Sequence, residues 1–280
     1  MEYLGYYNGE FAPLEELKIP ALDRAVYFGD GVYEFLYCRN KKPFAIREHM
    51  ARLEKSLALM KIDPPMPFAS IEDVIHECLK RVEGSENGVY LQVSRGTYYR
   101  KHAFPPAGTK SNLLLFATPF TLRDISAPLK LRTEPDMRWL RCDIKSLNLA
   151  MNILASEAAV QEGCAETIFH KDGYVTENAT SNLFIIKDGA LKTAPLSGEL
   201  LAGVTRNHVV ELSKACGIPV IEEAFTLEEM FSADEVIMAS TSTHCGRVSI
   251  IDDRPVGLKD PKTANRLQAA YRKKLLEGTR

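Results

Sequence analysis

One lysine lies in a segment that is unusual for a surface residue. Residues 138–148 read RWLRCDIKSLN, where apolar and charged side chains alternate too irregularly for the solvated face of a helix. A lysine is ordinarily exposed, because burying an unpaired ammonium is unfavourable. Lowering its pKa from about 10.4 to about 7 removes about 4 kcal/mol of preference for the ammonium and yields a free amine. Lys145 is therefore either a surface lysine or a nucleophile that attacks a carbonyl carbon.

A carboxylate occurs at the end of a predicted hairpin strand. Glu177 lies in the segment TENATSN (176–182), a polar turn within otherwise apolar strands. The simplest interpretation is a solvated residue at the hairpin edge. An acidic side chain is also what a cofactor such as pyridoxal phosphate requires at its ring nitrogen, because the protonated ring takes up electrons from the substrate. Both interpretations of Glu177 stay open from the residues alone.

Two segments have the composition of a phosphate site. The stretch LAGVTR (201–206) places a glycine just before a predicted helix, where backbone N–H groups can approach an anion. The stretch STST (240–243) follows a predicted strand and offers hydroxyl groups. Each alone is more often a helix cap or a loop. The sequence contains neither a G-x-G-x-x-G nor a P-loop motif that competes for this role.

Composition excludes several other classes of function. The net charge is only −2, from 35 Lys and Arg against 37 Asp and Glu, which gives no basis for binding nucleic acid or an anionic membrane. The six cysteines are dispersed and no H-E-x-x-H motif occurs, so we expect no metal site. The N-terminal residues do not resemble a signal peptide, and no apolar run approaches the roughly 20 residues of a membrane helix. We therefore expect a cytoplasmic protein.

Hydrophobic spacing and turn signals predict a mixed α and β chain. Asp-Gly pairs at 172–173 and 188–189 each separate two strand-like runs and predict hairpins. We expect Thr205 to cap a helix that ends near Ala215, and Thr226 with Glu229 to form a capping box. The remaining expected elements are helices over 47–61, 71–82 and 150–161 and strands over 89–95, 113–118, 129–132 and 235–239.

The motifs together resemble those of the pyridoxal-phosphate enzymes of fold type IV. The shared features are the segments around Lys145 and Glu177, GVTR (203–206) and the STST stretch, and the resemblance extends over nearly the whole chain. Three N-terminal motifs favour the D-amino acid aminotransferase branch: FGDGVYE (28–34), EH-x-x-RL (48–53) and RGT-x-x-R-x-H-x-FP (95–105).

The resemblance implies an architecture and a cofactor. We expect an α+β fold with a small N-terminal domain (1–118), a linker (119–123) and a larger C-terminal domain (124–280) with a pseudo-barrel sheet. The cofactor, pyridoxal 5'-phosphate, would bind in the cleft between the domains. The Arg and His that bind the substrate carboxylate in this branch reach across from a neighbouring subunit, so the resemblance also implies a homodimer.

Individual residues take roles from the resemblance. Lys145 would be the catalytic Schiff-base lysine that moves the α-proton, and Glu177 the partner of the pyridine nitrogen. The other cofactor-binding residues would be Arg52, Leu201, Val204, Thr205, Ser240 and Thr241, and the substrate carboxylate would be bound by Tyr33, Arg100 and His102. Without the family, an exposed basic loop is the simpler interpretation of Arg100 and His102.

Two positions depart from the family pattern, and several functions remain open. Asn178 occupies a position that is usually Gly, and Ala179 a run that is commonly serine. The expected reaction is ping-pong transamination between a D-amino acid such as D-alanine and a 2-oxo acid such as 2-oxoglutarate. The alternatives are a branched-chain L-aminotransferase or an aminodeoxychorismate lyase of the same fold, or a cofactor-binding protein without catalysis. The side-chain preference and the roles of His244 and Cys245 stay open.

Overall fold

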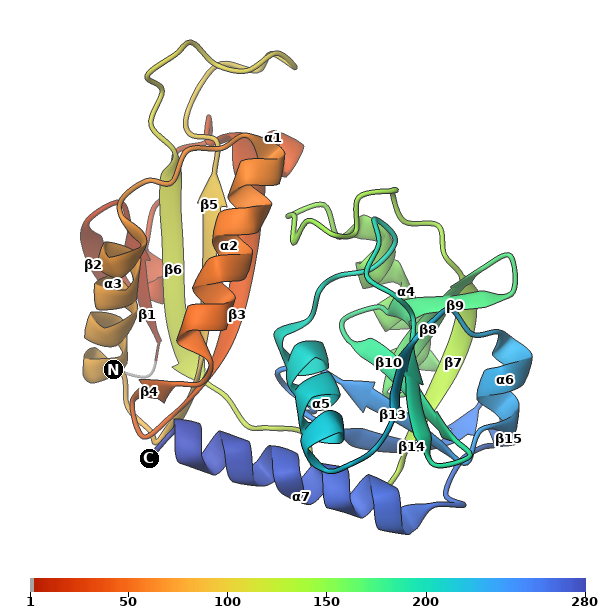
Figure 1. Cartoon of the computed structure of the whole chain (residues 1–280). Helices are drawn as coiled ribbons and strands as arrows, with labels where there is room; N and C mark the ends of the chain where they lie inside the picture. Colours follow the sequence, from red (N-terminus) through yellow and green to blue (C-terminus); the bar gives the residue numbers. More distant parts are fainter. Residues whose placement is uncertain (1–2) are drawn as a thin grey trace. The chain divides into compact units, whose positions relative to one another are not determined.

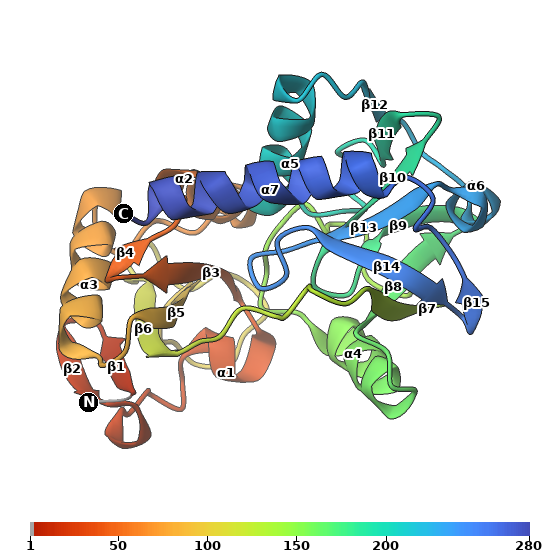
Figure 2. The ribbon, with the colours of Figure 1, turned by 90° about the horizontal axis from the view of Figure 1, so that it is seen from below.

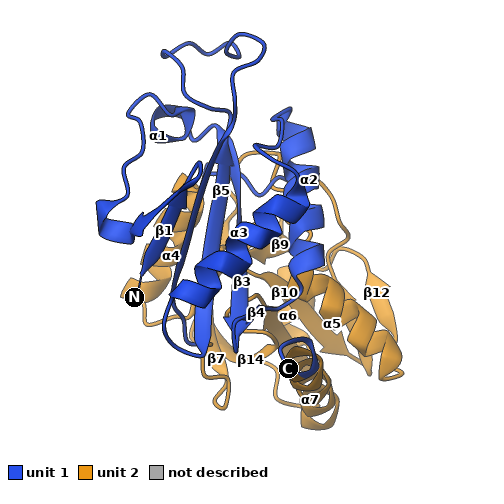
Figure 3. Cartoon of the chain, turned by 90° about the vertical axis from the view of Figure 1, so that its left-hand side faces the viewer, with its two compact units in different colours: residues 1–121, 144–148, 277–280 blue, residues 122–143, 149–276 orange. Residues whose placement is uncertain are grey.

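A computed structural model describes residues 3–280 of the chain, which divide into two compact units. Unit 1 takes the residues up to Thr121, together with 144–148 and 277–280, and unit 2 takes 122–143 and 149–276 (Figure 3). The predicted domain limits stay a prediction. The units differ from them in one respect that bears on the site, because residues 144–148 group with the N-terminal strands.

Unit 1 is an antiparallel six-stranded sheet with helices α2 and α3 on one face (Figure 1). The strand order is β2-β1-β6-β5-β3-β4. Its strands are β1 (Leu4–Tyr7), β2 (Glu10–Pro13), β3 (Gly31–Arg39), β4 (Lys42–Pro43), β5 (Glu86–Ser94) and β6 (Asn112–Pro119), and its helices are η1 (Leu14–Glu16), α1 (Arg24–Phe28), α2 (Ile46–Met60) and α3 (Phe68–Arg81).

The helical spacing of apolar residues explains how α2 attaches to this sheet. Met50, Leu53 and Leu57 are buried on one side of the helix and join the core of unit 1. Ile144, from the segment that carries the lysine, is buried in the same core. The helices predicted over 47–61 and 71–82 are thereby confirmed as α2 and α3.

Unit 2 is built on a nine-stranded sheet of order β12-β11-β10-β13-β14-β7-β8-β9, with β15 paired to β14. Its strands are β7 (Leu129–Pro135), β8 (Glu166–Lys171), β9 (Tyr174–Asn178), β10 (Asn182–Lys187), β11 (Ala190–Thr193), β12 (Val220–Glu222), β13 (Glu235–Ala239), β14 (Gly246–Ile251) and β15 (Arg254–Pro255). Its helices, labelled in Figure 2, are α4 (Ala150–Gln161), α5 (Val204–Ala215), α6 (Leu227–Ser232) and α7 (Pro261–Gly278). The last two residues of α7 group with unit 1.

The nine-stranded sheet curls on itself. Strands β9 and β10 are separated by four strands in the sheet order, yet only residues 179–181 join them. Three residues span about 10 Å, far less than the width of four strands at about 4.8 Å each. The edge strand β9 must therefore return toward β10, and this places Glu177 near the start of β10.

Most predicted elements of unit 2 are confirmed. Both Asp-Gly pairs form hairpin turns with positive φ, 51° and 82° for the first pair and 51° and 77° for the second. The helix over 150–161, the strand over 235–239 and the Thr226–Glu229 capping box also form as expected. Within residues 3–280, no helix combines the length and apolar character that crossing a membrane requires.

The predicted cap of α5 was wrong. The helix starts at Val204 and its cap is Gly203, so Thr205 lies inside the first turn. A Cβ on Gly203 would be only 2.1 Å from Asn182 Oδ1, so a larger residue at this position would displace the Asn182 side chain. The Thr205 hydroxyl is consequently not used in capping.

Candidate functional site

The segment that carries Lys145 is docked on strand β3 and helix α2. The Tyr33 N–H donates to the Lys145 carbonyl (2.9 Å), and the Leu147 N–H donates to the Gly31 carbonyl (3.0 Å). The Lys145 N–H in turn donates to Ser56 Oγ of α2 (3.3 Å). The backbone of Lys145 is thus held by regular secondary structure of unit 1, as a reacting group requires.

The side chain of Lys145 lies against an aromatic ring. Its Nζ is 4.2 Å from the centroid of the Tyr33 ring, and the residue is half-buried. Tyr33 also stacks on Tyr90, with 5.7 Å between the ring centroids. The structure therefore brings together the predicted catalytic lysine and the tyrosine predicted to bind the substrate carboxylate.

Arg52, a predicted phosphate ligand, is oriented by a buried carboxylate. Its Nε and Nη2 donate to the two oxygens of Glu34 at 2.7 and 2.8 Å, a bidentate pair. His49 Nδ1 lies 2.8 Å from Glu34 Oε2. Burial alone would raise the pKa of Glu34, but the Arg52 guanidinium and the His49 contact hold it well below the usual value. Burial lowers the pKa of His49, against the effect of Glu34.

Arg100 and His102 share one aromatic neighbour. The Arg100 guanidinium carbon lies 5.1 Å from the centroid of the Phe28 ring, and the His102 ring centroid lies 5.2 Å from it. Both residues are exposed on the loop that joins β5 to β6. The structure therefore groups the two basic side chains on an exposed loop, where they can meet a ligand or another chain.

Glu177 is buried at the end of β9 and accepts three hydrogen bonds. The donors are Arg138 Nη1 (2.6 Å), Asn182 Nδ2 (3.0 Å) and the Leu201 N–H (3.0 Å). Burial raises the pKa of Glu177 to about 7, although the Arg138 guanidinium and the hydrogen bonds oppose the rise. The solvated edge residue that the hairpin pattern alone suggested is not what the structure contains.

The sequence did not identify Arg138 as a site residue. Its Nε and Nη2 donate to Asp136 (3.0 and 2.8 Å) while Nη1 pairs with Glu177, so one guanidinium serves two carboxylates. Burial would lower the pKa of Arg138, but the hydrogen bond to Asp136 and the charge of Glu177 raise it. The signal that could have identified Arg138 is its place in the motif before Lys145. A buried carboxylate requires a cationic or N–H partner, and an arginine in that motif is a candidate for it.

The N-terminus of α5 is connected to Glu177. Asn182 donates from Nδ2 both to Glu177 and to the Leu201 carbonyl (3.0 Å each), and Leu201 precedes the helix by three positions. No side chain caps the helix at Gly203. The first N–H groups of a helix lack intrahelical acceptors and favour an anion. Val204 and Thr205, both predicted to bind phosphate, lie in this buried first turn.

The loop after β13 offers hydroxyl groups in an ordered turn. Ser240 Oγ lies 3.0 Å from Ser242 Oγ and accepts from the Thr243 N–H (3.2 Å). Ser240 and Thr241 are half-buried. Thr243 Oγ1 is buried, and within residues 3–280 no hydrogen-bond partner for it is found. A buried hydroxyl in this condition is destabilising unless a further group satisfies it, which fits a polar ligand at this loop.

The family model for amino-transferase class IV matches residues 31–251. A protein of Staphylococcus haemolyticus, named D-alanine aminotransferase, is 39% identical over 254 residues, 90% of each chain.

Solved structures share the fold. A branched-chain amino acid aminotransferase of Escherichia coli superposes with a TM-score of 0.88 over 99% of this chain and 96% of that one, at 24% identity. A hypothetical aminotransferase from Mycobacterium tuberculosis, in its PLP-bound form, gives a TM-score of 0.85 over 99% of both chains, at 22% identity. The fold class expected from the resemblance, with its curled sheet, is confirmed by these similarities.

Proposed function

Because the chain belongs to the class IV aminotransferase family, we propose that it transfers an amino group from a D-amino acid such as D-alanine to a 2-oxo acid such as 2-oxoglutarate. The transfer uses pyridoxal 5'-phosphate in two half-reactions. The name of the Staphylococcus haemolyticus relative supports the D-amino acid, since the branched-chain enzyme of Escherichia coli resembles this chain in fold at much lower identity.

One observation carries the proposal: a buried carboxylate with a raised pKa is hydrogen-bonded to the segment that leads into an uncapped helix N-terminus. Glu177 accepts from the Leu201 N–H, and α5 begins at Val204. A pyridine nitrogen needs an acidic partner, and a phosphate needs N–H groups. These two requirements are met by neighbouring parts of unit 2.

The residues present fit the cofactor. A Cβ at Gly203 would displace the Asn182 side chain, which donates to Glu177, and the Thr243 hydroxyl is buried with no hydrogen-bond partner found within residues 3–280. When bound, pyridoxal phosphate supplies a carbonyl carbon for the amino group and a ring that takes up electrons. Val204, Thr205, Ser240, Thr241 and Arg52 would hold the phosphate, and Leu201 would pack against the ring.

Two side chains would handle protons. Glu177 would accept the N–H of the protonated pyridine nitrogen through its carboxylate. The Nζ of Lys145 would hold the cofactor covalently and then move the α-proton of the substrate. Its docked backbone and its contact with Tyr33 limit the directions from which Nζ can approach.

The preference for D-amino acids over L-amino acids would follow from the residues that bind the substrate carboxylate. Arg100 can form two parallel hydrogen bonds with a carboxylate, and His102 and Tyr33 would complete the site. Fixing the carboxylate on one side determines which face of the α-carbon meets Lys145.

We also propose a homodimer in which Arg100 and His102 serve the neighbouring subunit. Helix α4 supports an interface, because Ile153, Leu154 and Val160 are 64%, 62% and 69% exposed. Such apolar surface on one helix favours association. Sedimentation equilibrium should give twice the chain mass, and Leu154→Glu should shift the protein toward the monomer, while Glu223→Gln, at an exposed position outside α4, should not.

The test of the proposed reaction is the visible absorbance of the purified protein with pyridoxal phosphate. D-alanine should convert the absorbance to that of the pyridoxamine form, and 2-oxoglutarate should restore it. L-alanine and L-leucine should leave it unchanged. Lys145→Ala should abolish the conversion, whereas Lys187→Ala, an exposed lysine of unit 2, should not alter it.

The other outcomes discriminate the alternatives. Conversion by L-leucine would identify a branched-chain enzyme and refute the assigned role of Arg100 and His102. Binding of the cofactor without conversion by any amino acid would indicate a non-catalytic protein. A protein that does not bind pyridoxal phosphate would contradict the cofactor assignment itself.

A further inference from the structure

One buried arginine forms a hydrogen bond to the backbone of the exposed loop that carries Arg100 and His102. Arg24 of α1 is only 3% exposed. Its Nε donates to Asp30 Oδ2 (2.7 Å), and its Nη1 donates to the Lys101 carbonyl (2.8 Å). Lys101 lies between Arg100 and His102 in the chain. A single guanidinium therefore holds the backbone between the two residues predicted to bind the substrate carboxylate.

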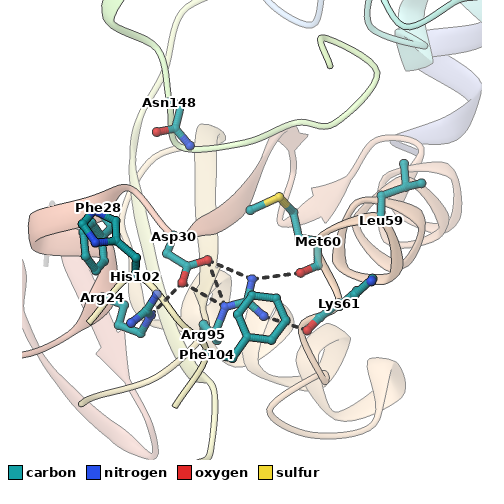
Figure 4. Close-up of a pocket in the computed structure, with 10 residues that line it drawn as sticks. All are labelled: Arg24, Phe28, Asp30, Leu59, Met60, Lys61, Arg95, His102, Phe104 and Asn148. Atoms are coloured by element: carbon teal, nitrogen blue, oxygen red, sulfur yellow. Dashed lines mark hydrogen bonds and ion pairs between the residues drawn. The ribbon is translucent and has the colours of Figure 1, made fainter. Parts of the chain in front are cut away.

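Asp30 connects this contact to the rigid part of unit 1. Arg95, at the end of β5, donates from Nε and Nη2 to Asp30 (2.9 and 3.0 Å), as Figure 4 shows. The remaining donors of Arg95 reach the carbonyls of Lys61 (2.7 Å) and Met60 (2.8 Å) at the end of α2. The network of Arg24, Asp30 and Arg95 is thus anchored on a strand and a helix.

The loop is also held on the far side of His102. The guanidinium of Arg95 lies 3.8 Å from the centroid of the Phe104 ring, a close cation–π contact. The network and the rings of Phe28, His102 and Phe104 line a cavity of about 420 Å³ (Figure 4). Arg24 at Lys101 and Arg95 at Phe104 therefore hold the loop on both sides of His102.

Three further hydrogen bonds attach the start of the loop to residues 22–27. The Arg24 N–H donates to the Gly96 carbonyl (3.0 Å), and the Tyr98 N–H donates to the Leu22 carbonyl (3.1 Å). The Tyr27 hydroxyl donates to the Tyr98 carbonyl (2.5 Å). The loop is exposed, but its backbone is restrained along most of its first half.

We propose that Arg24, Asp30 and Arg95 are positioning residues that set the place of Arg100 and His102 and thereby the affinity for the substrate carboxylate. This inference rests on the proposed function. Its physical basis is the planar fork of Arg24, which serves a carboxylate and a carbonyl in two directions at once. A lysine at this position keeps the charge beside Asp30, but its single ammonium cannot reproduce both directions.

The test is Arg24→Lys in the full-length protein with pyridoxal phosphate bound. Loss of the hydrogen bond to Lys101 should raise KM for D-alanine and for the 2-oxo acid about tenfold, as for one charge-assisted hydrogen bond. The kcat should stay within about twofold of the wild type, because the network touches no reacting atom. Pyridoxal phosphate affinity, measured by absorbance titration, should be unchanged, and amide hydrogen exchange over residues 97–104 should accelerate.

The matched control is Arg81→Lys. Like Arg24, Arg81 pairs with a carboxylate, here Glu77, and makes a cation–π contact, here with Phe11, but it lies on α3. It should leave KM and the exchange of the loop unchanged. Tyr27→Phe, which removes only the bond to the Tyr98 carbonyl, is the milder variant if Arg24→Lys destabilises the fold, and it should accelerate exchange at 97–99.

Several results would overturn the inference. Wild-type KM and wild-type loop exchange in Arg24→Lys would do so, as would wild-type exchange in Tyr27→Phe. A loss of kcat with KM unchanged would point to a different role for Arg24. Should the wild type not convert D-alanine, the proposed function fails, whereas the exchange measurements still decide whether Arg24 restrains the loop.

Discussion

Glu34 in unit 1 and Glu177 in unit 2 are two buried glutamates with opposite properties. Their exposed fractions are 0% and 5%, and each pairs with an arginine. The pKa of Glu34 is nevertheless lowered, while that of Glu177 is raised to about 7. Burial is thus common to both, and the partners decide the direction of the shift.

The difference lies in how each arginine distributes its hydrogen bonds. Arg52 gives two N–H groups to Glu34, whereas Arg138 gives one to Glu177 and two to Asp136. The negative charge of Asp136 raises the pKa of Glu177 further. A carboxylate with its own cation is a structural anchor, and one that shares its cation can hold a proton near neutral pH.

The largest effect, on stability, should come from removing the carboxylate of Glu34. Glu34→Gln leaves the half-buried Arg52 without its bidentate partner, and we expect the free energy of unfolding to fall by about 3 kcal/mol. Urea denaturation of the apo-protein measures this. Glu77→Gln, which breaks an exposed pair with Arg81, should leave it nearly unchanged. Equal effects of the two variants would contradict the anchoring role.

The next effect is on catalysis. Glu177→Gln removes the acid partner of the pyridine nitrogen, and kcat should fall about a hundredfold with the fold retained, since the loss is confined to reaction. Steady-state kinetics with D-alanine measure it. Glu166→Gln serves as the control, because Glu166 is another buried glutamate of unit 2 whose pKa burial raises. A similar fall in kcat for both variants would refute a specific role of Glu177.

The two glutamates should also give opposite slopes of stability against pH. Glu177 keeps a proton in the folded protein up to about pH 7 that the unfolded chain releases near 4.5, so its contribution to stability falls as pH rises through this window. Glu34 contributes stability that is present above 4.5 and lost as pH falls below it. The difference in unfolding free energy between wild-type and Glu177→Gln apo-protein, measured from pH 4.5 to 7, should therefore decline. A flat difference would contradict the raised pKa.

The smallest expected effect concerns the sharing of Arg138 between Glu177 and Asp136. Asp136→Asn leaves the charge of Arg138 to Glu177 alone and should lower the pKa of Glu177. The pH dependence of apo-protein stability should therefore shift to lower pH. The conservative variant Asp136→Glu should stay close to the wild type.

Local patterns in the sequence predicted much of the fold correctly. Apolar spacing located α2 and α3, and the two Asp-Gly pairs located both hairpins. These signals succeed because helical periodicity and turn geometry act between residues a few positions apart. The cap of α5 was mispredicted because a threonine near a helix start is a common cap, whereas this helix begins one residue before Thr205, at Val204.

Some features of the candidate site were likewise predicted from the sequence, and others were not. Lys145, Glu177 and the GVTR and STST segments were identified from residue types and motifs, and their assigned roles remain predictions. The sequence did not predict that Glu177 is buried with Arg138, Asn182 and Leu201 as its hydrogen-bond partners. It also did not predict that Arg24 contacts the backbone of Lys101, 77 positions away. Residue chemistry is inherent in the sequence, but burial and the sharing of one cation between carboxylates arise only when distant segments pack, so only the tertiary structure decides them.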